Sequence, residues 1–213
     1  FAMGVIVLST VHSPARTGIA LLMAFIGFGY TDLLRAEGMW GDFAFDLHWR
    51  WAPDAEDRLL ASQDESKSQA SAQYSPTEIQ DWLTNPGWSG FRGQQRASQQ
   101  RGAVFGSDWE SRPPKELWRV PVGPGWSSFA VAGNLLYTQE QVADRELISC
   151  YDAVTGRRIW TRGIESRFDD PLGGPGPRGT PTLAEGGVFS LGAQGWLSRV
   201  DPVSGELIWK KDL

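Results

Sequence analysis

The stretch that decides the fold is Tyr151-Asp152-Ala153-Val154-Thr155-Gly156-Arg157-Arg158-Ile159-Trp160, because its pattern recurs as Val200-Asp201-Pro202-Val203-Ser204-Gly205-Glu206-Leu207-Ile208-Trp209. Both copies keep the same spacing of the Asp, the Thr or Ser, the Gly and the Trp. The Asp can accept hydrogen bonds from backbone amides ahead of it, the hydroxyl supports the same turn, and the Gly supplies the positive φ that ends it. Each copy therefore predicts a turn between two strands, with the Trp on the second strand facing inward.

A third tryptophan, Trp118, precedes the first copy, and the spacings are 42 residues from Trp118 to Trp160 and 49 from Trp160 to Trp209. Repeats of about 40 to 50 residues that are built of strands are typical of β-propeller blades, and helical periodicity is absent here. The predicted fold class is all-β, a propeller of four-stranded blades of which about two are present. We expect strands near 126–132, 134–140, 146–152 and 157–162, then near 180–185, 187–192, 196–201 and 206–211.

The residues that define the repeat are interpreted as structural. Each Trp is expected to pack between neighbouring blades and to bury about 150–250 Å². Because Trp118 comes before any complete blade, we expect its strand to complete the last blade of a closed ring, which hides both sheet edges. The structural set is Trp118, Asp152, Gly156, Trp160, Asp201, Gly205 and Trp209.

The two repeat copies resemble those of the PQQ-like (quinoprotein alcohol dehydrogenase-like) β-propeller superfamily, which includes the outer-membrane assembly factor BamB. The resemblance covers about residues 85–213. Two further stretches, Trp88-Ser89-Gly90-Phe91-Arg92-Gly93 and Pro175-Gly176-Pro177-Arg178-Gly179-Thr180-Pro181-Thr182, are similar to membrane-anchored propeller proteins of planctomycete-type bacteria. The resemblance thus implies a propeller over 85–213.

The resemblance also implies two functions. Some members bind pyrroloquinoline quinone (PQQ) and calcium and oxidise alcohols or sugars, often with a vicinal disulfide; others are scaffolds without a cofactor. Cys150 is the single cysteine of the sequence, so it offers no vicinal pair. No cofactor is evident from the residues themselves, and PQQ and calcium follow from the resemblance alone. The preferred interpretation is a membrane-tethered module that binds protein or peptide partners, at a bacterial inner membrane with a periplasmic propeller; the alternative is a PQQ-dependent dehydrogenase.

Residues 1–35 predict two membrane helices that form a hairpin. The runs 1–8 and 19–30 are apolar and are joined by a turn at 13–16. Spanning a bilayer takes about 20 residues, so the second run is slightly short unless Leu33 and Leu34 extend it. The alternative is a signal peptide. The chain begins with Phe1 and is expected to be a fragment of a longer protein.

Residues 36–84 predict an acidic juxtamembrane linker. Segment 36–75 carries eight acidic and three basic residues, and its first half contains aromatics suited to a membrane interface or to covering the propeller. Segment 54–74 lacks the apolar residues needed to fold alone, so we expect a flexible tether there. Ser75-Pro76-Thr77-Glu78 predicts a capping box and a short helix over 76–83.

Several classes of chemistry are excluded by the residues that the propeller lacks. Both histidines, His12 and His48, lie outside it, so it offers no hydrolase triad, and no Cys/His cluster offers a zinc site. The arginines of 86–112 lie in a chain of pI about 5.1, which argues against nucleic acid; we expect this segment to pack across the propeller's face or rim. Asp169-Asp170 could serve acid/base chemistry or bind calcium, but is interpreted as solvated. The run 173–177 is interpreted as an inter-blade loop because it lacks the Lys-Ser/Thr of a phosphate loop.

Candidate ligand- or partner-binding residues are those expected at the ends of the inner strands and on the loops leading to them. Arg178 is the first of these, because an Arg flanked by Gly and Pro can approach a carboxylate or phosphate with little obstruction. The alternative is an Arg that bonds carbonyls between blades. The full set is Trp126, Ser127, Gln139, Glu140, Gln141, Arg178 and Thr180.

Overall fold

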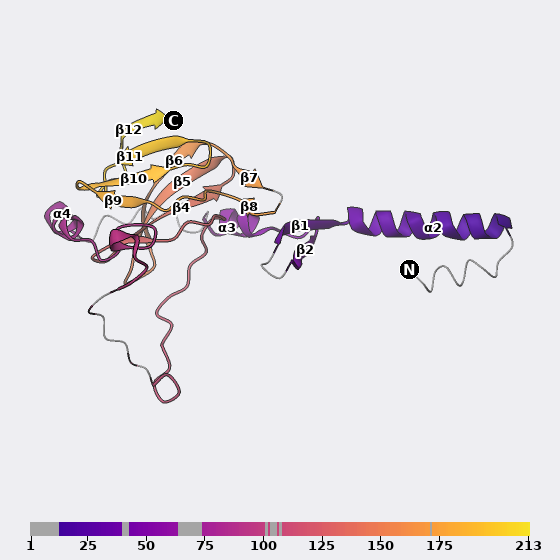
Figure 1. Cartoon of the computed structure of the whole chain (residues 1–213), viewed down its shortest axis with the longest axis horizontal. Helices are drawn as coiled ribbons and strands as arrows, with labels where there is room; N and C mark the ends of the chain where they lie inside the picture. Colours follow the sequence, from indigo (N-terminus) through magenta and orange to yellow (C-terminus); the bar gives the residue numbers. More distant parts are fainter. Residues whose placement is uncertain are drawn as a thin grey trace. The chain divides into compact units, whose positions relative to one another are not determined.

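The computed structural model describes residues 13–39, 43–63, 74–100, 102, 106, 108–170 and 172–213. The chain divides into two compact units, Phe1–Ala52 and Pro53–Leu213. Figure 1 labels the helices and strands of both units.

The C-terminal unit contains two four-stranded antiparallel sheets, drawn in orange to yellow in Figure 1. The first has the order β3 (Ala130–Ala132), β4 (Leu135–Val142), β5 (Arg145–Asp152) and β6 (Arg158–Glu165). The second has the order β9 (Thr182–Ala184), β10 (Gly187–Leu191), β11 (Trp196–Val200) and β12 (Leu207–Asp212). The predicted strands are therefore present in the predicted order. The two four-stranded antiparallel sheets are consistent with part of a propeller.

The turns of the two repeats have the predicted hydrogen bonds. Asp152 Oδ1 accepts from the backbone amides of Val154 (2.9 Å) and Thr155 (2.7 Å) and from the Thr155 hydroxyl (3.0 Å). The second turn repeats this pattern at Asp201 with distances within 0.1 Å of these values. Gly156 and Gly205 have φ of 72° and 69°, which favours glycine at both positions.

Trp118 and Trp160 each pack on the turn of the following repeat. The Trp118 indole donates to the Ala153 carbonyl (2.9 Å), and Trp160 donates to the Pro202 carbonyl (3.1 Å). A Cβ atom added at Gly156 or Gly205 would overlap the corresponding indole ring. The glycine is therefore required for the close approach of the ring as well as for its φ.

The strand predicted at Trp118 is absent. Among the described residues, those from 113 to 129 form no strand, because no neighbouring strand pairs with them; the turn contact still holds the indole in place. β3 likewise begins four residues later than predicted, since Trp126 donates its backbone amide to Pro177 O (2.9 Å) instead of to a strand.

Helix α4 (Pro76–Thr84) confirms the predicted capping box at Ser75 and Glu78. Its buried residues Ile79 and Leu83 join the hydrophobic core of the two sheets, and the Trp82 ring packs over Gly133. The helix predicted within a linker is thus part of the core of the C-terminal unit.

The prediction of a flexible tether over 54–74 is wrong for its first part. Helix α3 (Ala55–Gln63) packs Leu59, which is 1% exposed, against Val142 and Leu147 at the end of the β4–β5 hairpin. Glu56 accepts from the Ala143 amide and pairs with Arg167 at 3.3 Å. A single well-placed Leu and one ion pair fix the helix although the segment as a whole is polar; residues 64–73 lie outside the described residues.

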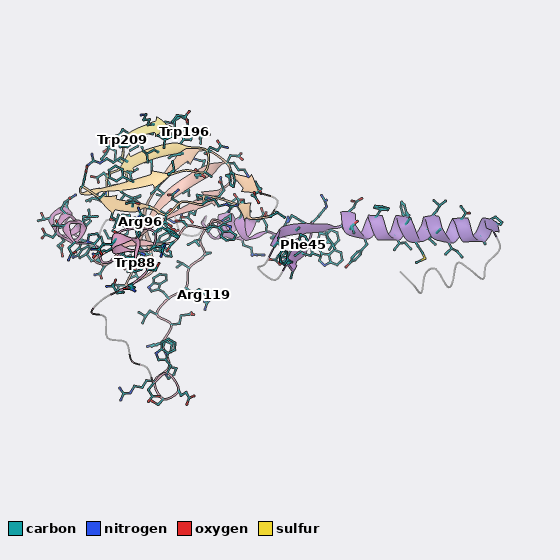
Figure 2. The ribbon with its side chains drawn as sticks, viewed as in Figure 1. Phe45, Trp88, Arg96, Arg119, Trp196 and Trp209 are labelled. Atoms are coloured by element: carbon teal, nitrogen blue, oxygen red, sulfur yellow. The ribbon has the colours of Figure 1, made fainter. Side chains whose placement is uncertain are left out.

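Segment 88–90 joins the innermost strands of the two sheets. Trp88 and Val131 exchange two backbone hydrogen bonds (3.0 and 2.7 Å), and the Leu183 amide donates to Ser89 O (2.8 Å). The expectation that this part of 86–112 packs across the propeller is therefore met, and Figure 2 labels Trp88 beside the sheets. The 3-10 helix η1 (Gln94–Arg96) follows it.

The N-terminal unit consists of helix α2 (Ser13–Asp32) and the antiparallel hairpin β1 (Leu34–Met39) and β2 (Phe45–Trp49). No helix within the described ranges is long and apolar enough to cross a membrane. The predicted spanning helix is thus not supported, because Leu34, expected to extend it, begins strand β1 instead. The first predicted helix, residues 1–8, lies outside the described residues, and a hairpin replaces the first half of the predicted linker.

Candidate functional site

The loop between the two sheets folds over the segment that precedes β3. The Trp126 indole donates to Gly173 O (2.8 Å), and the Ser128 amide donates to the Thr180 hydroxyl (3.0 Å). A Cβ atom at Gly176 (φ 100°) would overlap the Pro124 carbonyl, so glycine permits the two segments to approach. Residues far apart in sequence are thereby brought together, as the predicted inter-blade loop requires.

Arg178 lies between two aromatic rings. Its Cζ atom is 5.6 Å from the centre of the Trp126 ring and 5.1 Å from that of Phe168, within the range of cation–π contact. Nη2 donates to Gly174 O (2.8 Å), so the carbonyl contact considered as the alternative is present. The described residues give Nε and Nη1 no hydrogen-bond partner, and the side chain is exposed. The guanidinium is therefore held in position with donors left for a ligand.

Asp170 shapes the loop beside this arginine within the short ribbon β7 (Asp169–Asp170) and β8 (Gly174–Pro175). Its carboxylate accepts from the amides of Gly173 (2.6 Å) and Leu172 (2.9 Å). These bonds, and then the charge of Arg178, hold the pKa of Asp170 below its ordinary value. Asp169 pairs instead with Arg167 at 3.6 Å. The acidic pair, interpreted from sequence as solvated, thus supports the loop.

The exposed residues Trp126, Leu172 and Arg178, together with the half-buried Phe168, form what we call the Arg178 surface. Trp126 is 68% exposed and Leu172 is 59% exposed. Apolar rings and an arginine with unused donors are the residue types that dominate binding energy at protein interfaces. The surface can therefore bind a carboxylate and an adjacent apolar group together.

Polar residues beneath the Arg178 surface are largely used by the fold. The Ser127 hydroxyl accepts from the Gln139 amide (3.0 Å), and Gln139 Nε2 donates to Leu191 O (3.1 Å). Gln139 Oε1 is buried and has no partner among the described residues. Of the predicted residues, Trp126, Ser127, Gln139, Arg178 and Thr180 do lie together, and only Trp126 and Arg178 are exposed.

Glu140 and Gln141 belong to the interior and not to this surface. Glu140 is 1% exposed and accepts from the Gly123 amide and from the hydroxyls of Ser149 and Tyr151. Gln141 donates to the carbonyls of Ala143 and Ser166. The two residues are consecutive on β4, so their side chains lie on opposite faces of the sheet. Both are buried, so a ligand on the Arg178 surface does not reach them.

Phe168 and Leu172 were missed by sequence reasoning. The sequence feature that could have identified them is an aromatic and an aliphatic residue flanking Asp169-Asp170 in a loop rich in Gly and Pro. The described residues contain no group of three or more His, Cys, Asp or Glu side chains that could hold a metal ion.

The fold and the site thus define a segment of β-propeller with an exposed arginine–aromatic surface. Residues 111–213 match the family described as outer membrane protein assembly factor BamB. The matched part is just under half of the chain and supports a PQQ-like propeller, the resemblance that the repeat residues predicted.

Comparison with solved structures finds similar chains at low identity. BamB from Moraxella catarrhalis is 16% identical with a TM-score of 0.31, over 43% of this chain and 23% of that one. The quinohemoprotein alcohol dehydrogenase ADHIIG from Pseudomonas putida HK5 is 21% identical with a TM-score of 0.29, over 42% and 13%. The computationally designed Ika8 protein is 20% identical with a TM-score of 0.17, over 39% and 35%. The chain therefore spans under a quarter of the first two. A comparison with curated proteins gave no match.

Proposed function

We propose that this chain is a protein-interaction module of the bacterial cell envelope, and that the Arg178 surface binds an acidic segment of a partner protein. The observation that carries the proposal is the guanidinium of Arg178, held between Trp126 and Phe168 with two nitrogens unused by the described residues. This arrangement fits a ligand that presents a carboxylate beside an apolar side chain.

The stacked guanidinium is prepared for binding. An arginine that is already fixed by two rings and one carbonyl bond loses less rotamer freedom when it pairs with a carboxylate. Its planar donors match the two oxygens of that group. The exposed side chains of Trp126 and Leu172 offer apolar contact on the same surface. A Glu or Asp next to an aromatic or aliphatic residue is therefore the expected core of the partner motif.

The family description supports a protein partner, since it names an assembly factor for outer membrane proteins. For this chain, the inner-membrane attachment and the periplasmic location of the propeller are part of the proposal. Fractionation of cells into membrane, periplasmic and cytoplasmic extracts tests them; recovery of the intact protein in the cytoplasmic extract would count against an envelope role.

The PQQ-dependent dehydrogenase is the alternative function, and it is supported by the family resemblance alone. Incubation of the full-length protein with PQQ and calcium, followed by dye reduction with alcohols and sugars, tests this alternative.

Selection from a displayed peptide library tests the interaction proposal directly. We expect the full chain to enrich peptides that place Asp or Glu beside an apolar residue, and the Arg178→Gln variant to lose this enrichment. Arg119→Gln is the matched control, because Arg119 is an exposed arginine paired with Glu116 away from the Arg178 surface. Equal enrichment by all three proteins, or no enrichment of acidic residues, would refute the proposal.

A further inference from the structure

In the β1–β2 hairpin of the N-terminal unit, the side chains that the structure describes on one face are all apolar. The register pairs Leu34 with Trp49 and Arg35 with His48, so neighbouring residues alternate between the two faces. One face carries Leu34, Ala36, Met39, Phe45, Leu47 and Trp49. The opposite face carries Arg35, Asp46 and His48.

The apolar face is exposed. Phe45 is 57% exposed, Leu47 is 53% exposed and Trp49 is 43% exposed. On the opposite face, the partly exposed side chains of Asp46 and His48 are bonded to each other at 2.9 Å. Figure 2 labels Phe45 on this hairpin. A two-stranded ribbon is at best marginally stable in water without a layer over its apolar face. This ribbon presents that face outward, so something else must cover it.

Aromatic residues connect this face to the end of helix α2. The Tyr30 ring meets Trp49 edge-on at 6.0 Å, and Trp49 stacks on Trp51 at 5.1 Å. Tyrosine and tryptophan are the residues enriched where hydrocarbon meets water in a membrane, because each ring combines an apolar body with a polar tip.

Helix α2 indicates what covers the combined surface. Its exposed large residues include Leu21, Leu22 and Met23 in succession, followed by Phe25, Ile26 and Phe28. At 3.6 residues per turn, these six positions span about 220° of the helix circumference, which is wider than a stripe. Between residues 19 and 30, the remaining face carries the small uncharged residues Ala20, Ala24 and Gly27. A protein partner that covers an amphipathic helix needs only one stripe; fluid lipid covers every side. Because α2 and the hairpin belong to one unit and meet at Tyr30, the same medium should cover both.

We infer that the apolar face of the β1–β2 hairpin, together with Tyr30 and Trp51, is a lipid-contact surface that lies in the interfacial layer of a bilayer. The inference goes beyond the proposed envelope location by naming the contact surface, and it does not depend on the Arg178 surface. Segment 30–51 contains four acidic residues and two basic ones, so apolar burial and not basic charge supplies the binding. Contact should therefore form on zwitterionic lipid as well as on anionic lipid, with little dependence on salt.

Site-directed spin labelling of the full chain tests this surface. Cys150 is buried and is replaced by Ala, after which single cysteines at Leu47 and His48 place labels on opposite faces of the hairpin. Arg119→Cys supplies a label on the other unit, at a side chain that is 83% exposed. The proteins are mixed with vesicles of phosphatidylcholine alone or with added phosphatidylglycerol, and collision of the label with oxygen and with a nickel chelate is measured.

The expected result is a several-fold higher oxygen-to-nickel accessibility ratio at position 47 than at 48 or 119, on both vesicle types and at low and high salt. Equal ratios at 47 and 48 would overturn the inference. Low accessibility of position 47 to both reagents would also overturn it, because that pattern means that protein, either a second copy or another part of the chain, covers the face. Contact only with anionic vesicles at low salt would show that electrostatic attraction to the lipid headgroups causes the binding. This result would refute burial of the apolar face in lipid.

Discussion

Replacement of Trp160 by Ala tests the contact between successive repeats. The Trp160 side chain is 9% exposed, its ring lies against Gly205, and its indole donates to Pro202 O. Truncating a buried Trp typically lowers the free energy of unfolding by about 3–5 kcal/mol. The Pro202 carbonyl keeps a second donor, the Tyr137 hydroxyl at 3.2 Å, so no additional cost for an unpaired acceptor is expected. A loss of about 3–5 kcal/mol is a large share of the roughly 5–15 kcal/mol that stabilises a domain.

Trp209→Ala is the matched control for this variant. Trp209 occupies the equivalent position on β12 but is 38% exposed and contacts Phe189 in T-shaped geometry. No glycine within the described residues lies against its ring. Trp209→Ala should therefore lower the free energy of unfolding by less, about 1–2 kcal/mol, because Trp209 covers less apolar area. Denaturant titrations followed by circular dichroism measure both variants. If Trp160→Ala unfolds at the wild-type midpoint, or Trp209→Ala costs as much, the proposed contact between repeats is wrong.

Three further predictions concern single sites in the C-terminal unit. Gly156→Ala should destabilise by more than about 1 kcal/mol, because the position has φ of 72° and touches an indole, whereas Gly106→Ala, with open space around it, should be near neutral; thermal melts compare them. Leu59→Ala should make α3 more susceptible to limited proteolysis than the adjacent, exposed Leu60→Ala does, and equal digestion would count against docking of the helix. Burial tends to raise the pKa of Asp152, but the hydrogen bonds to its carboxylate outweigh burial and lower the pKa overall. The ionised carboxylate should therefore stabilise the fold above the unfolded pKa of about 3.9, and this stabilisation should be lost as the pH falls through the lower folded pKa. Asp152→Asn should accordingly lose stability at neutral pH and show a flatter acid limb in urea titrations between about pH 5 and 2.

The parts of the fold that could be predicted from sequence are those fixed by local chemistry. The Asp152 and Asp201 turns depend on hydrogen bonds within four residues, and the capping box of α4 depends on Ser75 and Glu78 alone. Such patterns can be recognised without knowledge of the rest of the chain. The periodic Trp residues then predicted the strands between the turns.

The parts that could not be predicted depend on contacts between distant residues. α3 is held by Leu59 against Leu147 and by Glu56 against Arg167, and a polar segment gives no sign of such partners. Burial of Glu140 likewise depends on the Gly123 amide, which arrives from another segment.

The candidate site could be predicted in part, for the same reason. Arg178 and Trp126 were each predicted as candidates because each was expected at the start of an inner strand. The second ring, Phe168, is brought to Arg178 only by the course of the inter-blade loop. The composition of that loop, rich in Gly and Pro, does not specify its course.

The most direct test of the account is a calorimetric double-mutant cycle between Arg178 and the acidic residue of a selected peptide. Wild type and Arg178→Gln are each titrated with the peptide and with its Glu→Gln form. The account predicts a coupling of about 1 kcal/mol, as for a partly exposed charged pair, and its decrease at high salt. Peptide binding that is unchanged by either substitution, or two losses that simply add, would contradict the role of the Arg178 surface.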